Sequence, residues 1–307
     1  KALPDLDFSG IDTSLDLFGK HLAAPILISS MTGGTAAGAD FNYKLSSAAD
    51  QCGIAMGVGS QRAAIEDPQL SETFNIRKFA PKALLFANLG AVQLNYGYGI
   101  EECKKAVDML EADALYLHLN PLQEALQPEG NHDFSGLLPK IEQICRSLPV
   151  PVLVKEVGWG IDLETAKQLL EVGVVGIDVA GAGGTSWAKV EMHRQPETKS
   201  RKSAIKLAFE DWGIPTAQNL LQLRELEGDP LIIASGGLRD GVDLAKSLAL
   251  GATLGGYARK FLLAAYLGER ELIDQIETIK TELRTAMFAC GVSSLSEWNI
   301  SHLEGIE

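Results

Sequence analysis

Short aliphatic runs alternate along the chain with longer segments in which apolar residues recur at helical spacing. Such runs are typical of buried strands, and their regular alternation with helices indicates βα units and a parallel sheet. Eight repeats over about 250 residues predict a (β/α)8 TIM barrel of the α/β class, because an open doubly wound sheet rarely needs so many. The expected strands are Pro25–Ser30, Gly53–Gly59, Ala83–Leu89, Ala114–Asn120, Pro151–Val157, Gly176–Ala180, Leu231–Ser235 and Thr253–Ala258.

The helical segments carry cap signals of their own. In one of them, apolar residues recur at helical spacing behind Asp162, a predicted N-cap, and Gly173 then ends the helix. The expected helices are Ala37–Gln51, Ile100–Glu111, Leu137–Ser147, Asp162–Val172, Thr216–Glu227, Asp240–Leu250 and Glu269–Cys290.

Two segments fall outside this repeat, although we expect residues 1–307 to form one domain. Residues 1–24 form an N-terminal extension, in which Thr13–Leu22 predicts a β-hairpin that could plug the N-terminal end of the barrel. Residues 182–213 include the polar run Glu191–Lys206, which we interpret as a loop excursion over the C-terminal end.

The composition supports a large core and limits the partners. Hydrophobic residues make up 46% of the 307 residues, which excludes a disordered chain. The formal net charge of −13 argues against nucleic acid or anionic membrane as a partner, since both attract basic surfaces. No apolar stretch reaches the roughly 20 residues that span a bilayer. The four cysteines form no C-x-x-C pair, so we expect a reducing compartment, the cytoplasm.

Polar or glycine-rich residues follow every expected strand, which is where TIM barrels place their active sites. Gly236-Gly237 and Ala258-Arg259 follow the last two strands, where this fold commonly binds a phosphate. The alternative is that Gly-Gly only makes a tight turn. A second glycine-rich turn at 181–184, after the sixth strand, favours the phosphate.

Two basic residues stand at strand ends. Lys155 ends a very apolar strand, where a lysine can form a Schiff base or hydrogen-bond a cofactor. The alternative, a buried pair with Glu156, is less favoured because neighbouring strand residues point to opposite sides. Arg62 lies among small residues and could bind a phosphate with two hydrogen bonds; otherwise it forms a surface salt bridge.

A polar cluster follows the fourth strand. His118 and Asn120 share a strand face by the two-residue period, and Gln123 and Glu124 come soon after. A single carboxylate such as Glu124 suits Mg²⁺, which keeps water ligands and takes further oxygens from substrate phosphates. The alternatives are turn chemistry at Asn120-Pro121 and a solvated Glu124.

Taken in order, these residues resemble the type 2 isopentenyl diphosphate isomerases, flavin-dependent enzymes of isoprenoid synthesis. The resemblance covers about residues 3–290, nearly the whole chain, and the ordered set is far more specific than any one Gly-Gly pair. The motifs that carry it are Met31-Thr-Gly-Gly34, Gly57-x-Gly-Ser-Gln-Arg62, His118-x-Asn-x-x-Gln-Glu124, Gln127-Pro-Glu-Gly130, Gly183-Gly-Thr-Ser-Trp187 and Ser235-Gly-Gly237.

The resemblance implies interconversion of isopentenyl and dimethylallyl diphosphate, with FMN active in its reduced form, Mg²⁺, and NADPH as reductant. It implies FMN contacts from Ser30, Met31, Thr32, Ser60, Asn88, Lys155, Thr185, Gly236, Gly237, Leu238, Ala258 and Arg259. It implies substrate contacts from Ser60, Gln61, Arg62, His118, Asn120 and Gln123, of which Gln123, His118 and Asn120 are the candidate catalytic residues. Glu124 would hold Mg²⁺ against the diphosphate.

Two further expectations come from the resemblance. The family forms homo-oligomers, so we expect a tetramer or an octamer. Its N-terminal Arg-Lys pair, which reaches the substrate diphosphate, has no counterpart near Lys1. Either the chain lacks the pair or a segment preceding Lys1 carries it, and only the second alternative is compatible with full substrate affinity.

Moving a double bond requires a proton to be added at one carbon and removed from another, with any cation shielded from water. His118 and Glu124 are the only candidate acid–base groups at the strand ends, and Glu124 is better explained as a metal ligand. We therefore expect reduced FMN to shuttle the proton with no net redox change.

Two alternatives of other kinds stay open. One is an FMN-dependent TIM-barrel dehydrogenase or oxidase, although Ser235–Arg239 contains no histidine base and Gly181–Trp187 contains no nucleophilic cysteine. The other is a non-catalytic flavin-binding sensor, against which the cluster of Arg62, Gln123 and Glu124 argues, because binding FMN alone would not require it.

Overall fold

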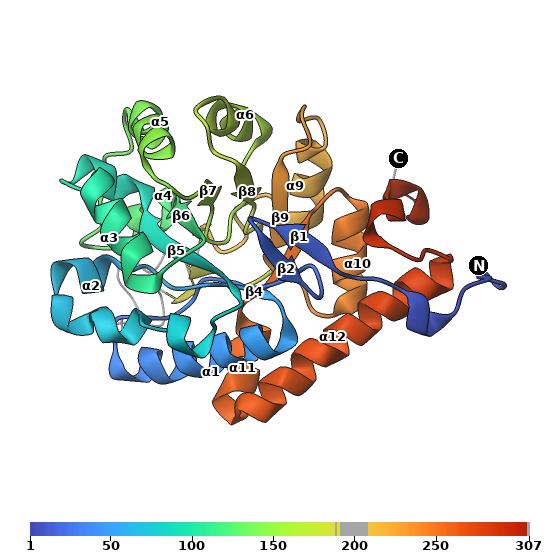
Figure 1. Ribbon diagram of the computed structural model, residues 1–307. Helices are drawn as coiled ribbons and strands as arrows, with labels where there is room; N and C mark the ends of the chain where they lie inside the picture. The colour runs from blue at the N-terminus through green and yellow to red at the C-terminus, as the bar shows by residue number, and fades with distance from the viewer. Residues whose placement is uncertain (188, 191–207, 306–307) are drawn as a thin grey trace.

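A computed structural model of the chain describes residues 1–187, 189–190 and 208–305. Eight parallel strands close into the predicted barrel in the order β10-β3-β4-β5-β6-β7-β8-β9, and helices surround it (Figure 1). The strands are β3 (Ile26–Ile28), β4 (Ala55–Gly57), β5 (Leu84–Gly90), β6 (Ala114–His118), β7 (Val152–Lys155), β8 (Gly176–Asp178), β9 (Leu231–Ser235) and β10 (Leu254–Tyr257).

The predicted helices are present, and Asp162 caps its helix as expected by accepting a hydrogen bond from the Thr165 N–H at 3.0 Å. They are α1 (Ala36–Cys52), α3 (Ile100–Leu110), α5 (Leu137–Ser147), α6 (Leu163–Glu171), α9 (Thr216–Leu223), α10 (Gly241–Ala249) and α12 (Glu269–Cys290). Short 3-10 helices lie at Phe8–Gly10, Pro68–Phe74, Arg77–Phe79, Ala91–Asn95, Leu295–Glu297 and Ile300–His302. No helix in the described ranges is long and apolar enough to cross a membrane.

Three further helices begin directly behind strand ends, where the pattern predicts none. They are α2 (Arg62–Glu66), α4 (Pro121–Leu126) and α11 (Arg259–Leu267). Three candidate residues, Arg62, Glu124 and Arg259, therefore lie on helices. Helical geometry fixes their direction more firmly than a turn would.

The predicted hairpin covers the N-terminal end of the barrel. β1 (Leu15–Leu17) pairs antiparallel with β2 (Lys20–Leu22). Phe18 and Gly19 form the turn with φ values of 49° and 76°, and positive φ at both positions matches the twist of hairpin strands. The Phe18 ring meets the Phe86 ring edge-on at 6.4 Å, and Leu22 joins the apolar cluster inside the barrel.

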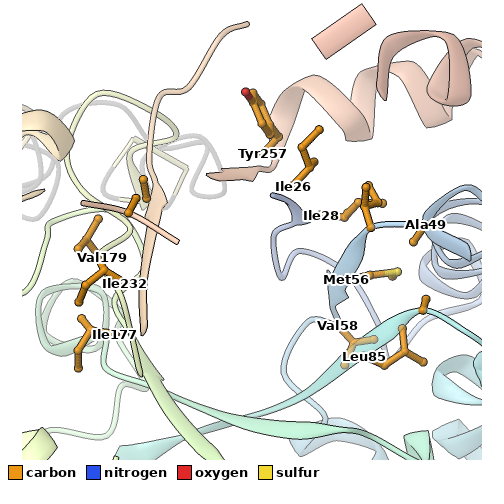
Figure 2. Packing of buried hydrophobic residues seen from close by; sticks show 14 of the residues in the cluster. Ile26, Ile28, Ala49, Met56, Val58, Leu85, Ile177, Val179, Ile232 and Tyr257 are labelled. Atoms are coloured by element: carbon orange, nitrogen blue, oxygen red, sulfur yellow. The ribbon is translucent and has the colours of Figure 1, made fainter. Parts of the chain in front are cut away.

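Side chains alternate between the two faces of the barrel wall. The outer set packs against the helices, and Figure 2 shows several of its members, from Ile26 and Met56 to Ile177. The inner set includes Phe86 and Tyr116, whose rings stack with centroids 4.8 Å apart. Towards the C-terminal end of the barrel, the inward-facing side chains become polar. The mouth of the barrel is therefore lined by polar groups that lie above an apolar interior.

Two expectations about organisation stay predictions. Residues 188 and 191–207, which form most of the expected excursion 182–213, lie outside the described residues. The division of the chain into a single domain over 1–307 is likewise an expectation.

Candidate active site

The predicted site residues gather at the C-terminal mouth of the barrel, because the strands are parallel and each residue ends a strand or follows one. Ser30, Met31 and Thr32 follow β3; Ser60, Gln61 and Arg62 follow β4; Asn88 lies in β5; His118 ends β6, with Asn120, Gln123 and Glu124 behind it; Lys155 ends β7; Thr185 follows β8; Gly236, Gly237 and Leu238 follow β9; Ala258 and Arg259 follow β10. A cavity of about 360 Å³ opens at this end beside Met31, Thr32, Ser60 and Leu262.

Two glycine turns pack backbone against backbone where a phosphate is expected. Gly236 has a φ of +102°, and a Cβ there would lie 2.1 Å from the Gly181 carbonyl oxygen. A Cβ on Gly184 would lie 2.7 Å from the Gly237 nitrogen. Next to β9, α11 begins without a side-chain cap at Ala258, so its first N–H groups are left for an anion. A tight turn alone would explain the positive φ of Gly236. It would not explain why two glycine turns and the start of α11 come together at one place.

A chain of hydrogen bonds holds His118 in place. His118 Nδ1 lies 2.8 Å from Asn88 Oδ1, and Asn88 Nδ2 donates to the Val58 carbonyl at 3.0 Å. The Asn88 N–H donates to Gln61 Oε1 at 2.9 Å, and Gln61 Nε2 donates to the Ala106 carbonyl at 2.8 Å. Gln61 is completely buried, so in this structure it holds Asn88, and its expected substrate contact stays a prediction.

The environment of His118 keeps its imidazole neutral. Burial, with a further contribution from the Lys155 charge, lowers the pKa of His118 from 6.5 to about 3. Because Asn88 presents its carbonyl oxygen, Nδ1 carries the proton and Nε2 presents a lone pair. His118 can therefore accept a hydrogen bond through Nε2 but has no proton to give there at neutral pH.

Glu124 and Arg62 are joined through Asn131. The Glu124 carboxylate accepts from Asn120 Nδ2 at 2.8 Å and from the Asn131 N–H at 2.6 Å. Arg62 donates through its terminal nitrogen to Asn131 Oδ1 at 3.2 Å and through Nε to Glu66 at 2.7 Å. A guanidinium group and a carboxylate thus face the mouth two hydrogen bonds apart.

The donor set fits Mg²⁺ bound with the help of a phosphate. Over the described ranges, no three His, Cys, Asp or Glu residues gather closely enough to hold a metal by themselves. Among the described residues, Asn120 Oδ1 is buried without a hydrogen-bond partner next to the Glu124 carboxylate, whose oxygens keep further lone pairs. Two hard oxygen donors with room for water and phosphate match the preference of Mg²⁺.

Residues behind β3 and at the end of β7 fit a flavin ring. Ser30 Oγ is buried and unpaired within the described structure, so it can take a ligand as its partner. A Cβ on Gly59 would lie 2.6 Å from the Thr32 carbonyl oxygen, so the two turns leave no room for a side chain between them. Lys155 is only 6% exposed, and its Nζ donates to the Glu156 carbonyl oxygen.

Glu156 does not form a side-chain pair with Lys155. This pair was the less favoured alternative from the sequence. Its carboxylate accepts from the N–H groups of Val157, Gly158 and Trp159 at 2.6–2.8 Å. Burial raises the pKa of Glu156 to about 7, while these hydrogen bonds and Lys155 act in the opposite direction. Glu156 therefore shapes the turn behind β7 rather than neutralising Lys155.

Comparison with known proteins places the chain in a family. It is 52% identical to an isopentenyl-diphosphate delta-isomerase of Nostoc sp., over 96% of this chain and 84% of that protein. It is 48% identical to a protein of the same name from Rickettsia akari, over 96% of this chain and 86% of the other. A family model described as FMN-dependent dehydrogenase matches residues 133–305. The chain belongs to the FMN-dependent, type 2 isopentenyl-diphosphate delta-isomerase family.

Solved structures agree with the fold of this type 2 family member. A lactate oxidase of Pediococcus acidilactici matches with a TM-score of 0.70 and 18% identity, over 98% of this chain and 80% of that one. A flavocytochrome b2 with sulfite bound matches with a TM-score of 0.67 and 22% identity, over 96% and 73% of the respective chains. Identities this low show the shared barrel alone.

Sequence reasoning did not single out Asn131, Tyr116 or Asp178 for this type 2 isomerase site, and it named Ser235 only as part of the Ser235-Gly-Gly237 motif. Asn131 gave no signal, because its contacts depend on tertiary folding. The two-residue period would have placed the other three inside the barrel: Tyr116 from His118, Asp178 from Gly176 and Ser235 from Ile233. Ser235 Oγ donates to Asp178 Oδ1 at 2.5 Å.

Proposed function

We propose that this chain interconverts isopentenyl and dimethylallyl diphosphate, with reduced FMN and Mg²⁺ as cofactors and NADPH as the flavin reductant. Its curated relatives carry the name of this reaction. The structural observation that carries the proposal is the link from Arg62 through Asn131 to Glu124 at the barrel mouth. A guanidinium group and a metal ion side by side would bind a diphosphate well, and Arg62 and Glu124 would supply the cation and the metal ligand.

The diphosphate would bind between Arg62 and the Mg²⁺ ion held by Glu124 and Asn120. Arg62 donates a hydrogen bond from Nε to Glu66, and this bond orients its terminal nitrogens towards the mouth. Neutral His118 would accept a hydrogen bond through Nε2 from a protonated phosphate oxygen or a metal-bound water. Ser60 and Gln123 complete the expected substrate contacts.

FMN would lie on the opposite wall, with its phosphate at Gly236, Gly237 and the start of α11. Lys155 and Ser30 would hydrogen-bond the ring, and Met31, Thr32, Thr185 and Leu238 would line it. When bound, reduced FMN would supply a proton donor and acceptor together with an electron-rich surface for a developing cation. The protein residues orient both ligands and exclude water, which shields such a cation.

An apolar cluster offers a place for the five-carbon chain of the substrate. Leu126 of α4 and Trp159 behind β7 are almost fully buried, and Leu122, Trp187 and Phe209 pack against them. Leu122 stands next to Gln123 in α4, so the cluster adjoins the proposed diphosphate site. Apolar side chains here would bind the hydrocarbon by removing its surface from water.

The proposal also covers the cellular compartment and the oligomeric state of the protein. Cys52, Cys103, Cys145 and Cys290 are all free thiols, which agrees with a reducing compartment such as the cytoplasm. On α11, Leu263, Tyr266 and Leu267 are 54–76% exposed, and exposed apolar groups of this size support a homo-oligomer, a tetramer or an octamer.

An anaerobic assay of the purified chain with isopentenyl diphosphate tests the proposal. Dimethylallyl diphosphate should form only when FMN, a reductant and Mg²⁺ are all present. Steady consumption of NADPH without isomerisation would favour the FMN-dependent dehydrogenase or oxidase instead. Flavin binding with no turnover under any reducing condition would favour the sensor.

A further inference from the structure

A buried carboxylate that the proposed reaction does not use lies on the inner wall of the barrel. Asp178 ends β8 and is completely shielded from solvent. In the strand register it pairs with Lys155 of β7, which in turn pairs with His118 of β6. Paired residues of neighbouring parallel strands point to the same side, so all three line the barrel just below the mouth.

The two oxygens of the Asp178 carboxylate have different surroundings. Oδ1 accepts from Ser235 Oγ at 2.5 Å and from the Ala180 N–H at 3.3 Å. Oδ2 has no hydrogen-bond partner within the described structure, and neither does the buried Tyr116 hydroxyl. The Tyr116 hydroxyl lies close enough to lower the pKa of Asp178, although the geometry between the two groups is not that of a hydrogen bond.

A buried charge is stable only when other groups compensate it. Burial raises the pKa of Asp178, and the largest opposing influence is the charge of Lys155, followed by the hydrogen bonds from Ser235 and Ala180. Lys155 is itself 6% exposed and its Nζ donates to the Glu156 carbonyl, so its charge is also held away from solvent, on the strand next to Asp178. The charge of Lys155 also lowers the pKa of His118 and the pKa of Glu156.

We propose that Asp178 is the internal counter-ion of Lys155 and a positioning residue of the flavin site, so that the cofactor meets a charge-balanced pair rather than a lone cation. The inference rests on the proposed function, in which Lys155 contacts FMN. The pair would also set the midpoint potential of the bound flavin. Without the carboxylate, the remaining positive charge favours anionic reduced FMN over oxidised FMN.

The first test measures the midpoint potential of bound FMN in the purified holoenzyme. Asp178→Asn should raise the ratio of the oxidised to the reduced dissociation constant at least tenfold, which for a two-electron couple is about 30 mV. Asp274→Asn is the matched control, since it makes the same change of charge at an exposed position of α12, and its ratio should stay within about threefold of wild type. Equal weakening of both flavin forms by Asp178→Asn would overturn the inference.

The second test needs no flavin and keeps the inference decidable if Asp178→Asn does not fold. Both proteins compared carry Glu156→Gln, because Glu156 is a second buried carboxyl whose pKa, about 7, also depends on Lys155. Lys155→Met removes the cation, so Asp178 should take up a proton and show a protonated carboxyl band in the infrared spectrum of the full chain at neutral pH, whereas Glu156→Gln alone should lack that band. Its presence in Glu156→Gln alone, or its absence after Lys155→Met is added, would refute the pairing. Failure of the chain to bind FMN would refute the proposed function and leave this result standing.

Discussion

Neutral His118 should make the folded protein lose stability as the pH falls below about 6.5. Its pKa is lowered from 6.5 to about 3 by burial and by Lys155. Between these two values, the unfolded chain binds a proton that the folded chain does not, so the free energy of unfolding decreases as the pH decreases. This contribution is complete above the unfolded pKa and is lost progressively towards pH 3.

The size of the effect at pH 5 follows from the two pKa values. The solution lies about 1.5 pH units below the unfolded value and well above the folded one. At about 1.4 kcal/mol per unit, the protein should lose about 2 kcal/mol between pH 7 and pH 5 through His118 alone. That is a large fraction of the stability of an ordinary domain.

Urea unfolding at pH 7 and pH 5 measures this difference. His118→Gln has no imidazole to protonate and keeps a donor for Asn88, so it should lose about 2 kcal/mol less than wild type between the two pH values. The same substitution at exposed His21 controls for the loss of a histidine as such. Equal losses in wild type and His118→Gln would mean that His118 is not held neutral, and the reasoning would be wrong.

Three other substitutions test the rest of the site. Glu124→Gln should abolish the response of turnover to Mg²⁺ while the flavin absorbance of the purified protein is kept; an unchanged Mg²⁺ titration would remove Glu124 from the metal site. Gly236→Ala should prevent flavin binding, because its Cβ would lie 2.1 Å from a carbonyl oxygen, whereas Gly228→Ala, also at positive φ but in open space, should bind flavin normally in a fluorescence titration. Gln61→Leu should destabilise the protein by about 1–3 kcal/mol in urea unfolding by leaving the Asn88 N–H unpaired; no loss would show that water replaces the lost partner.

The barrel could be predicted because its pattern is local. Each aliphatic run encodes a strand, and each cap, such as Asp162, marks where a helix begins. The ends of the expected strands placed His118 and Lys155 at the mouth, and both end their strands in the structure. α11 was missed for a physical reason: Phe261 and Ala265 are buried, yet Leu263, Tyr266 and Leu267 are exposed, so its apolar residues do not mark one face.

The details of the site could not be predicted, because they depend on contacts between distant segments. Asn131 joins Arg62 to Glu124 across the mouth, and nothing in its neighbours along the chain indicates this. Gln61 follows a strand like the other candidates, but its side chain points into the wall and bonds Ala106 of α3. Position in the sequence gives the level of a residue in the barrel, and packing decides its direction.

The charges at the mouth argue that the two anionic ligands are not bound by a simple excess of cations. Arg62 is paired with Glu66, and Lys155 has Asp178 below it, so much of the local positive charge is already balanced. The chain as a whole carries −13. We therefore expect much of the binding to come from the backbone N–H groups of the glycine turns and of α11 and from the proposed Mg²⁺ at Glu124, beside the hydrogen bonds of Arg62. Fixed dipoles and a metal ion can hold an anion without a net positive charge on the protein, which would suit a pocket that releases a diphosphate product after every turnover.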